Sequence, residues 1–204
     1  MLRLTSSWRI FAIVNNLLLL KKKKTALYFG SFNPLHYGHL AVAEYVIKHL
    51  DIDELLFVLS PHNPFKSNDL LLGAQERLAA LKKEISKFNK ALKQSPDFKA
   101  LPRRCVKVSD LEFSLPEPRY TFNTLAEFAR CEPDTEFFLV VGADSFAAME
   151  RWYRGTEILK NYKIIVYPRK GYRIKTKCRK WHALYLEEAP LNNISSTEIR
   201  NRAL

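Results

Sequence analysis

Two histidines with a two-residue spacing stand at the start of a predicted helix, directly after a glycine-containing turn. Residues 30–39 read Gly-Ser-Phe-Asn-Pro-Leu-His-Tyr-Gly-His, which places the imidazoles at His36 and His39. A strand that turns through small residues into a helix offers backbone N–H groups and the positive end of a helix dipole, which together favour phosphate. Imidazole N–H groups add further donors. The segment therefore predicts nucleotide chemistry.

The histidine pair has other interpretations. Histidines at a helix start can cap the helix or fill a core position, and two at this spacing can share a metal ion. No third metal ligand stands at a suitable spacing, however, and Gly30 and Gly38 allow close backbone approach while Pro34 stiffens the loop. These features favour a role in holding a triphosphate and stabilising charge that develops on the reacting phosphorus.

A second candidate phosphate site lies near the other end of the chain. Residues 194–200 read Ile-Ser-Ser-Thr-Glu-Ile-Arg. Alone, the Ser-Ser-Thr-Glu sequence is typical of a capping box. A helix start with three hydroxyls and an arginine one turn later can also bind phosphate. Two such sites in one fold would suit a nucleoside triphosphate.

Strand-like and helix-like segments alternate beyond residue 24. This alternation predicts an α/β protein with a Rossmann-like parallel sheet and helices on both faces, with ligands at the carboxyl ends of the strands. Thr121 or Asn123 is expected to cap one helix, and residues 89–104 are expected to form a solvated loop or a helix extension. Strands are predicted over 26–32, 54–60, 105–111, 136–141, 163–167 and 183–186, and helices over 38–50, 74–88, 121–130, 143–150 and 195–202.

Composition narrows the functional classes. An apolar fraction of 47% supports a folded core and excludes global disorder. The net charge of +12 suits nucleic acid, an anionic membrane surface or a polyphosphate substrate. Because the basic residues show no aromatic-interleaved repeat, no nucleic-acid partner is expected.

The cysteines and the N-terminal segment indicate in which cellular compartment the protein is expected. Three cysteines without a Cys-x-x-Cys pair indicate reduced thiols and a cytoplasmic protein. The apolar run 8–20 is short for a membrane span, and its lysines follow it, which is not typical of a cleaved signal. We expect no stable membrane anchor, a dispensable extension over residues 1–24, and a single domain over 25–204.

The two end segments together resemble the nucleotidyltransferase superfamily, which carries His-x-Gly-His and Ile-Ser-Ser-Thr-x-Ile-Arg motifs. Three middle segments make the chain most similar to the nicotinate-nucleotide adenylyltransferase family. They are 60–66, 119–125 and the stretch from Gly142-Ala143-Asp144 to Trp152-Tyr153. The resemblance implies the nucleotidyltransferase fold and transfer of the adenylyl group of ATP, with Mg²⁺, to nicotinate mononucleotide.

The same resemblance implies roles for individual residues. His36 and His39 are the expected catalytic contacts to the ATP phosphates. Trp152 is expected to stack on the pyridine ring, while Thr121 and the Tyr153 backbone read its carboxylate and Asp144 lies near polar groups of the nucleotide. No protein metal-ligand set is expected. The remaining ATP and phosphate contacts are Gly30, Ser31, Phe32, Asn33, Lys66, Ser195, Ser196, Thr197 and Arg200.

Several alternatives stay open. Trp152 could be a core aromatic, Asp144 a helix N-cap, and Lys66 a solvated lysine. Asn123 stands where the family usually has aspartate. The given sequence stops four residues after Arg200, whereas relatives usually continue through another short segment. The chain could instead be a phosphopantetheine adenylyltransferase, a cytidylyltransferase, or an inactive nucleotide- or RNA-binding relative. The sequence does not decide between nicotinate and nicotinamide mononucleotide, and it is compatible with a homo-oligomer.

Overall fold

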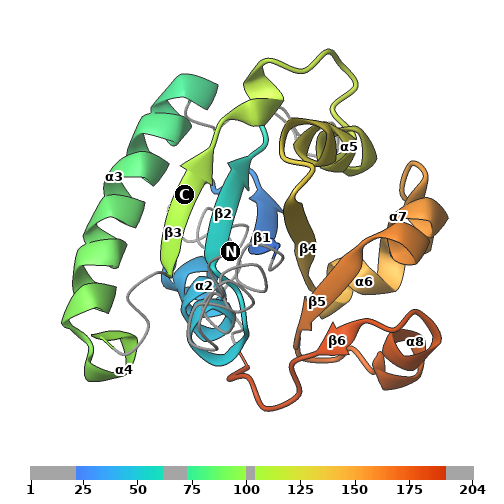
Figure 1. The fold of residues 1–204 in the computed structure, drawn as a ribbon. Coiled ribbons are helices and arrows are strands. Elements are labelled where there is room, and N and C mark those ends of the chain that lie inside the picture. The colour runs from blue at the N-terminus through green and yellow to red at the C-terminus, as the bar shows by residue number, and fades with distance from the viewer. Residues whose placement is uncertain (1–21, 62–72, 100–103, 192–204) are drawn as a thin grey trace, which may run out of the picture.

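The computed structural model describes residues 22–61, 73–99 and 104–191. These residues form one sheet of six parallel strands in the order β3-β2-β1-β4-β5-β6, with helices around it (Figure 1). The predicted class, a Rossmann-like parallel sheet with helices on both faces, is confirmed. The strands are β1 (Lys23–Gly30), β2 (Glu54–Leu59), β3 (Cys105–Ser109), β4 (Thr135–Gly142), β5 (Lys163–Tyr167) and β6 (Leu184–Tyr185).

Helices connect successive strands along the chain, as in a doubly wound sheet. Figure 1 shows α3 beside the β3 edge and α5 to α8 around the β4–β6 half. The α-helices are α2 (Tyr37–His49), α3 (Ala74–Gln94), α4 (Pro96–Lys99), α5 (Thr121–Cys131), α6 (Ala143–Ala148), α7 (Gly155–Asn161) and α8 (Lys175–Lys180), and the 3₁₀ helices are η1 (Leu111–Phe113) and η2 (Met149–Arg151).

Alternate strand residues face two separate hydrophobic cores. In β1, Ala26 and Tyr28 pack with α2 and α3, whereas Leu27 belongs to the core under α5, α6, α7 and α8. All six residues of β2 are buried. Strands covered on both faces are nearly continuous apolar runs, which is why the sequence pattern located them well.

Of the two alternatives expected after residue 88, the helix extension is confirmed for residues 89–94. Helix α3 continues to Gln94, and Phe98 in α4 is buried. Asn89 explains the extension, because its side chain pairs with the open edge of β3: Nδ2 donates to the Val106 carbonyl at 2.6 Å and Oδ1 accepts from the Val106 N–H at 3.2 Å. A polar residue that reads as solvated therefore closes a sheet edge.

Three further expectations need correction. Neither Thr121 nor Asn123 caps α5, because the helix already begins at Thr121 and its N-cap is Tyr120. Helices α7 and α8 were not predicted. Strand β1 spans 23–30 instead of 26–32, because the chain leaves the sheet after Gly30 and turns at residues 33–34. The predicted helix 195–202 lies outside the described residues.

The start of β1 is held by side chains from β2 and from the segment directly before β2. Lys23 Nζ donates to Glu54 at 2.8 Å, the Lys24 N–H donates to Asp53 at 2.8 Å, and Lys24 Nζ pairs with Asp51 at 2.6 Å. Residues 23 and 24, expected to belong to the extension, are thus part of the sheet. No helix in the described part of the chain is long and apolar enough to cross a membrane.

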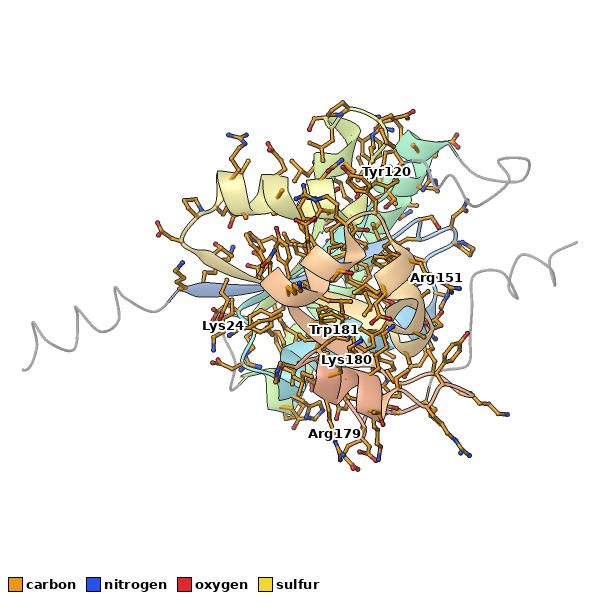
Figure 2. All side chains as sticks on the ribbon, turned by 90° about the vertical axis from the view of Figure 1, so that its right-hand side faces the viewer. Lys24, Tyr120, Arg151, Arg179, Lys180 and Trp181 are labelled. Carbon is orange, nitrogen blue, oxygen red and sulfur yellow. The ribbon has the colours of Figure 1, made fainter. Side chains whose placement is uncertain are left out.

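The strand order reverses between β1 and β4. In a doubly wound sheet, ligands bind in the crevice outside the carboxyl ends of the strands at such a switch point. Gly30 and Gly142 end the two strands concerned. Lys24, near the amino end of β1, and Arg151, in the segment that follows β4, lie on opposite sides of the molecule in Figure 2. The β1–α2 turn and the β4–α6 turn therefore open toward the same edge.

Candidate active site

His36 and His39 form a reciprocal cap at the start of α2. His36 is the N-cap, and its Nδ1 accepts from the Gly38 N–H at 3.1 Å. The Nδ1 of His39 in turn accepts from the His36 N–H at 3.3 Å. The two rings lie with centroids 3.8 Å apart and planes 32° apart. The capping interpretation of the pair is therefore correct, and its geometry determines what else the rings can do.

An imidazole nitrogen that accepts a hydrogen bond carries no proton, so the neutral ring has its proton on the other nitrogen. Both histidines are consequently Nε2–H donors. The His36 Nε2 is buried and has no hydrogen-bond partner among the described residues. The Gly38 N–H, one of the backbone donors at the helix start, is taken by the His36 ring.

The same tautomers bear on the metal-pair interpretation. A histidine ligates a metal through a nitrogen that lacks a proton. In both rings that nitrogen, Nδ1, is already occupied by a backbone N–H. The described residues also contain no cluster of three or more histidine, cysteine, aspartate or glutamate side chains placed to hold a metal ion. The Nδ1 atom of each ring is thus engaged within the cap and is not open to a metal ion in this arrangement.

The turn before the histidines is shaped by Phe32. This residue has φ 41° and is only 4% exposed, and its ring packs against Phe57 and His39 at centroid distances of 5.0 and 5.1 Å. Gly30 makes room for the ring, because a Cβ there would lie 2.8 Å from two of its carbons. The side chain of Phe32 therefore supports the turn, and only its backbone is placed to line a phosphate site.

Arg77 of α3 ties two strand-end loops together. Its guanidinium donates to the carbonyls of Ser31 at 2.9 Å, Ser60 at 3.0 Å and Pro61 at 2.6 Å. The residue is 7% exposed, and burial lowers the pKa of its guanidinium. Arg77 thus fixes the turn after β1 relative to the loop after β2. The sequence analysis did not identify it, since it stands among the apolar positions of a helix.

Two charged side chains that follow β4 and β5, Asp144 and Arg169, lie next to each other. Asp144, in the first turn of α6, lies 3.9 Å from Arg169, which follows β5. Burial is the main cause of the lowered pKa of His36, and the charge of Arg169 lowers it further. Burial likewise raises the pKa of Tyr28 to about 12, with opposing contributions from Arg169 and Asp144. Asp144 thus lies beside Arg169, whose charge acts on His36.

Asp144 is not the N-cap of α6, which is Gly142. A Cβ at Gly142 would lie 2.4 Å from Asp144 Oδ1 and 3.2 Å from Arg169 Nε. A larger residue at position 142 would therefore displace the Asp144 carboxylate from its place beside Arg169. Arg169 was also missed in the sequence, although its place directly after a predicted strand is the signal that could have found it.

The residues expected to hold the mononucleotide come from two other segments at the same edge. Thr121 begins α5 and is half-buried, and Trp152 follows η2 and packs partly against the core under α5–α8. Tyr153 is 49% exposed and stacks on Tyr120 with ring centroids 4.4 Å apart. The core interpretation of Trp152 therefore holds in part, and the ring keeps an accessible portion.

The remaining expected contacts are either placed with the turn or not described. Ser31 is half-buried and Asn33 is 5% exposed. The following lie outside the described residues: Lys66, Ser195, Ser196, Thr197 and Arg200.

Sequence comparisons identify the family of the chain. Residues 27–202 match the profile of the cytidylyltransferase-like family. A protein of Bacteroides fragilis named "Probable nicotinate-nucleotide adenylyltransferase" is 37% identical over 88% of this chain and 81% of its own length. A protein of Flavobacterium psychrophilum with the same name is 38% identical over 87% of this chain and 84% of its own length.

Solved structures share the fold. The Plasmodium falciparum nicotinic acid mononucleotide adenylyltransferase in complex with NaAD matches with a TM-score of 0.66 and 23% identity, over 88% of this chain and 83% of that one. The same enzyme in complex with APC matches with a TM-score of 0.63 and 20% identity over the same shares. At these identities the structures support the architecture alone.

Proposed function

The chain belongs to the nicotinate-nucleotide adenylyltransferase family, and from this premise we propose that it transfers the adenylyl group of ATP to nicotinate mononucleotide. The products are nicotinate adenine dinucleotide and pyrophosphate, which places the reaction in NAD biosynthesis. The observation that carries the proposal is the paired Nε2–H orientation of His36 and His39 at the start of α2.

A triphosphate fits this end of the sheet for electrostatic reasons. The positive end of the α2 dipole and the two stacked imidazoles lie together at the start of the helix, and burial and the charge of Arg169 lower the pKa of His36 and so favour its neutral form. A neutral donor keeps its proton and polarises phosphate without passing it on. The charge of Arg169 adds attraction for the anion from the β5 side.

The chemical step needs no covalent enzyme intermediate. A phosphate oxygen of the mononucleotide attacks the α-phosphorus of ATP in line, a new P–O bond forms, and the bond to the bridging oxygen of the β-phosphate breaks as pyrophosphate leaves. Charge accumulates on the phosphoryl oxygens in the transition state. Donors already oriented by the cap stabilise that charge without reorganising, which is the basis of this kind of catalysis.

Mg²⁺ enters with ATP as part of the substrate. The ion prefers oxygen ligands and retains several waters, so the triphosphate and water can supply its coordination shell. The two histidines present protonated nitrogens, which suit the phosphate oxygens and not the ion.

The mononucleotide half is assigned to the segments around Thr121 and Trp152. Trp152 stacks on the pyridine ring, and Thr121 with the Tyr153 backbone reads its carboxylate, while Asp144 meets polar groups of the nucleotide. The phosphate contacts from Lys66, Ser195, Ser196, Thr197 and Arg200 complete the site in this proposal.

The three cysteines form no disulfide with one another, which favours a cytoplasmic setting.

Acceptor choice tests the proposal. Pyrophosphate release is measured with MgATP and, in turn, nicotinate mononucleotide, nicotinamide mononucleotide and phosphopantetheine, with MgCTP as the control nucleotide. We expect the highest kcat/KM with ATP and nicotinate mononucleotide. Equal efficiency with the two mononucleotides would refute the nicotinate preference and leave adenylyl transfer standing. Turnover with phosphopantetheine alone would overturn the assignment.

A further inference from the structure

Two exposed tyrosines stack on each other across two segments that are distant in the sequence. Tyr120 is 37% exposed and Tyr153 is 49% exposed, yet their rings lie with centroids 4.4 Å apart and planes 21° apart. Tyr120 lies on the outer surface near the start of α5 in Figure 2. One tyrosine directly precedes Thr121, and the other directly follows Trp152.

The stack continues into a second pair of contacts between the same segments. The ring of Phe122 meets Tyr153 edge-on, with centroids 6.4 Å apart and planes 79° apart. The Arg154 guanidinium lies 3.9 Å from the centroid of Phe122. We call these four residues, Tyr120, Phe122, Tyr153 and Arg154, the aromatic ladder. Its members alternate between the start of α5 and the segment after η2.

The Arg154 end of the ladder is itself fixed. Its Nε donates to Glu157 Oε1 at 2.6 Å, and a second nitrogen pairs with Glu157 Oε2. Its backbone has φ 51°, a conformation that a non-glycine residue adopts only when its surroundings hold it there. Gly155 follows because a Cβ there would lie 1.9 Å from the Met149 carbonyl oxygen. The segment is therefore presented in one conformation.

Both segments are anchored in the same core, which lies under α5, α6, α7 and α8. Leu125 and Phe128 hold α5, whereas Met149 and Ile158 hold η2 and α7. At the facing ends of the two segments burial is only partial: Thr121 and Trp152 are half-buried, and Trp152 packs partly against that core. There the ring contacts and the cation–π contact of the aromatic ladder join the start of α5 to the segment after η2.

We propose that the aromatic ladder positions Thr121 and Trp152 relative to each other and so determines how tightly and how selectively the pyridine ring is bound. This inference rests on the proposed function. Tyr120 acts through its neighbour Thr121 and makes no contact with the reacting atoms, so it is a positioning residue. The ring face carries the effect, and the hydroxyl group is not needed.

The test compares Tyr120→Ala with Tyr120→Phe in steady-state assays. Tyr120→Ala should raise KM for nicotinate mononucleotide by about tenfold, as expected for loss of an aromatic pair that sets a binding distance. Its KM for ATP and its kcat should stay within about twofold of wild type, because the histidine turn is untouched. The preference for nicotinate over nicotinamide mononucleotide should fall. Tyr120→Phe should retain the wild-type values.

Two comparisons separate positioning from general damage. Tyr172→Ala removes another exposed tyrosine, 45% accessible, and should leave both KM values unchanged. Adding Tyr120→Ala to Tyr153→Ala should change KM little further, because the stack is already lost. An unchanged mononucleotide KM in Tyr120→Ala, or equal increases for both substrates, would overturn the ladder while leaving adenylyl transfer intact. Lack of wild-type turnover with nicotinate mononucleotide would refute the proposed function and the ladder's role with it.

Discussion

The His36 and His39 rings share one cap, so the proton position on each ring is set by a backbone N–H and not by bound substrate. Protonation of His36 requires Nδ1 to release the Gly38 N–H. Burial and the Arg169 charge both oppose that protonation and lower the pKa of His36. A phosphate donor that stays neutral and correctly oriented follows from the fold before any nucleotide arrives.

The titration of His36 should therefore lie below that of an ordinary histidine. Arg169→Gln should raise the pKa of His36, because a positive charge that disfavours the imidazolium is removed. The acid limb of kcat/KM should move to higher pH in the same variant. Lys170→Gln is the matched control, since Lys170 is exposed and does not contribute to the His36 shift. Imidazole ¹⁵N NMR titration measures both effects, and an unmoved His36 titration in Arg169→Gln would contradict the assigned proximity.

Gly30→Ala should damage the turn that precedes the histidines. The added Cβ would lie 2.8 Å from the Phe32 ring, which is buried and cannot swing away. We expect a loss of about 1–3 kcal/mol in the free energy of unfolding and a higher KM for ATP. Chemical denaturation and steady-state kinetics measure the two quantities.

Gly73→Ala is the control for that substitution. Its Cβ would lie 3.6 Å from the nearest atom, an ordinary contact, so stability should change by no more than about 0.5 kcal/mol. Adding Phe32→Leu to Gly30→Ala should recover part of the loss if the ring is the obstacle. Equal unfolding free energies for the two glycine variants would show that the turn after β1 accommodates a Cβ at position 30 without strain.

Glu112→Gln tests a buried carboxyl group beside α5. Glu112 is 2% exposed and accepts from Thr124 Oγ1 at 3.0 Å, and burial raises the pKa of its carboxyl. A raised pKa means that the protonated form stabilises the fold, fully below the ordinary glutamate pKa, and that this contribution is lost as pH rises through the raised value. Glutamine keeps the acceptor without a charge.

The stability of Glu112→Gln should accordingly match or exceed that of wild type at neutral pH. The difference in unfolding free energy between the two proteins should shrink as pH falls through this window, and urea unfolding at several pH values measures it. A variant that is less stable than wild type at neutral pH would show that Glu112 is needed as a charge.

Removal of the N-terminal segment tests where the domain begins. Deletion of residues 1–21 should leave turnover and melting temperature near the full-length values, in keeping with the expected dispensable extension. Deletion through residue 24 removes the contacts of Lys23 with Glu54 and of Lys24 with Asp51 and Asp53. We expect a melting temperature several degrees lower for that shorter chain. Equal melting temperatures for the two truncations would contradict the boundary at β1.

The sequence located the central strands because their burial on both faces leaves a continuous apolar run. The predicted strands 54–60 and 136–141 match β2 (54–59) and β4 (135–142) within one residue at each end. Helices α7 and α8 left no such pattern. Helix α7 starts from the left-handed Arg154, and α8 reads Lys-Thr-Lys-Cys-Arg-Lys, with only Cys178 buried.

For the candidate site too, some residues could be predicted from the sequence and others could not. His36 and His39 were predicted from their place at a helix start after a glycine-containing turn, and Asp144 from the resemblance of its segment to a family motif. The roles of Arg77 and Arg169 depend on contacts between residues far apart in the sequence, such as Arg77 with Ser31 and Arg169 with Asp144. The proton positions on the histidines depend on hydrogen bonds within the cap, which spacing alone leaves undetermined.

The direct test of the central claim is the turnover of His39→Ala with MgATP and nicotinate mononucleotide, alongside its circular dichroism spectrum and melting curve. If the paired Nε2–H groups stabilise the transition state, kcat should fall on the order of 10²–10³-fold in a folded variant. A folded His39→Ala enzyme that retains full turnover would contradict the account.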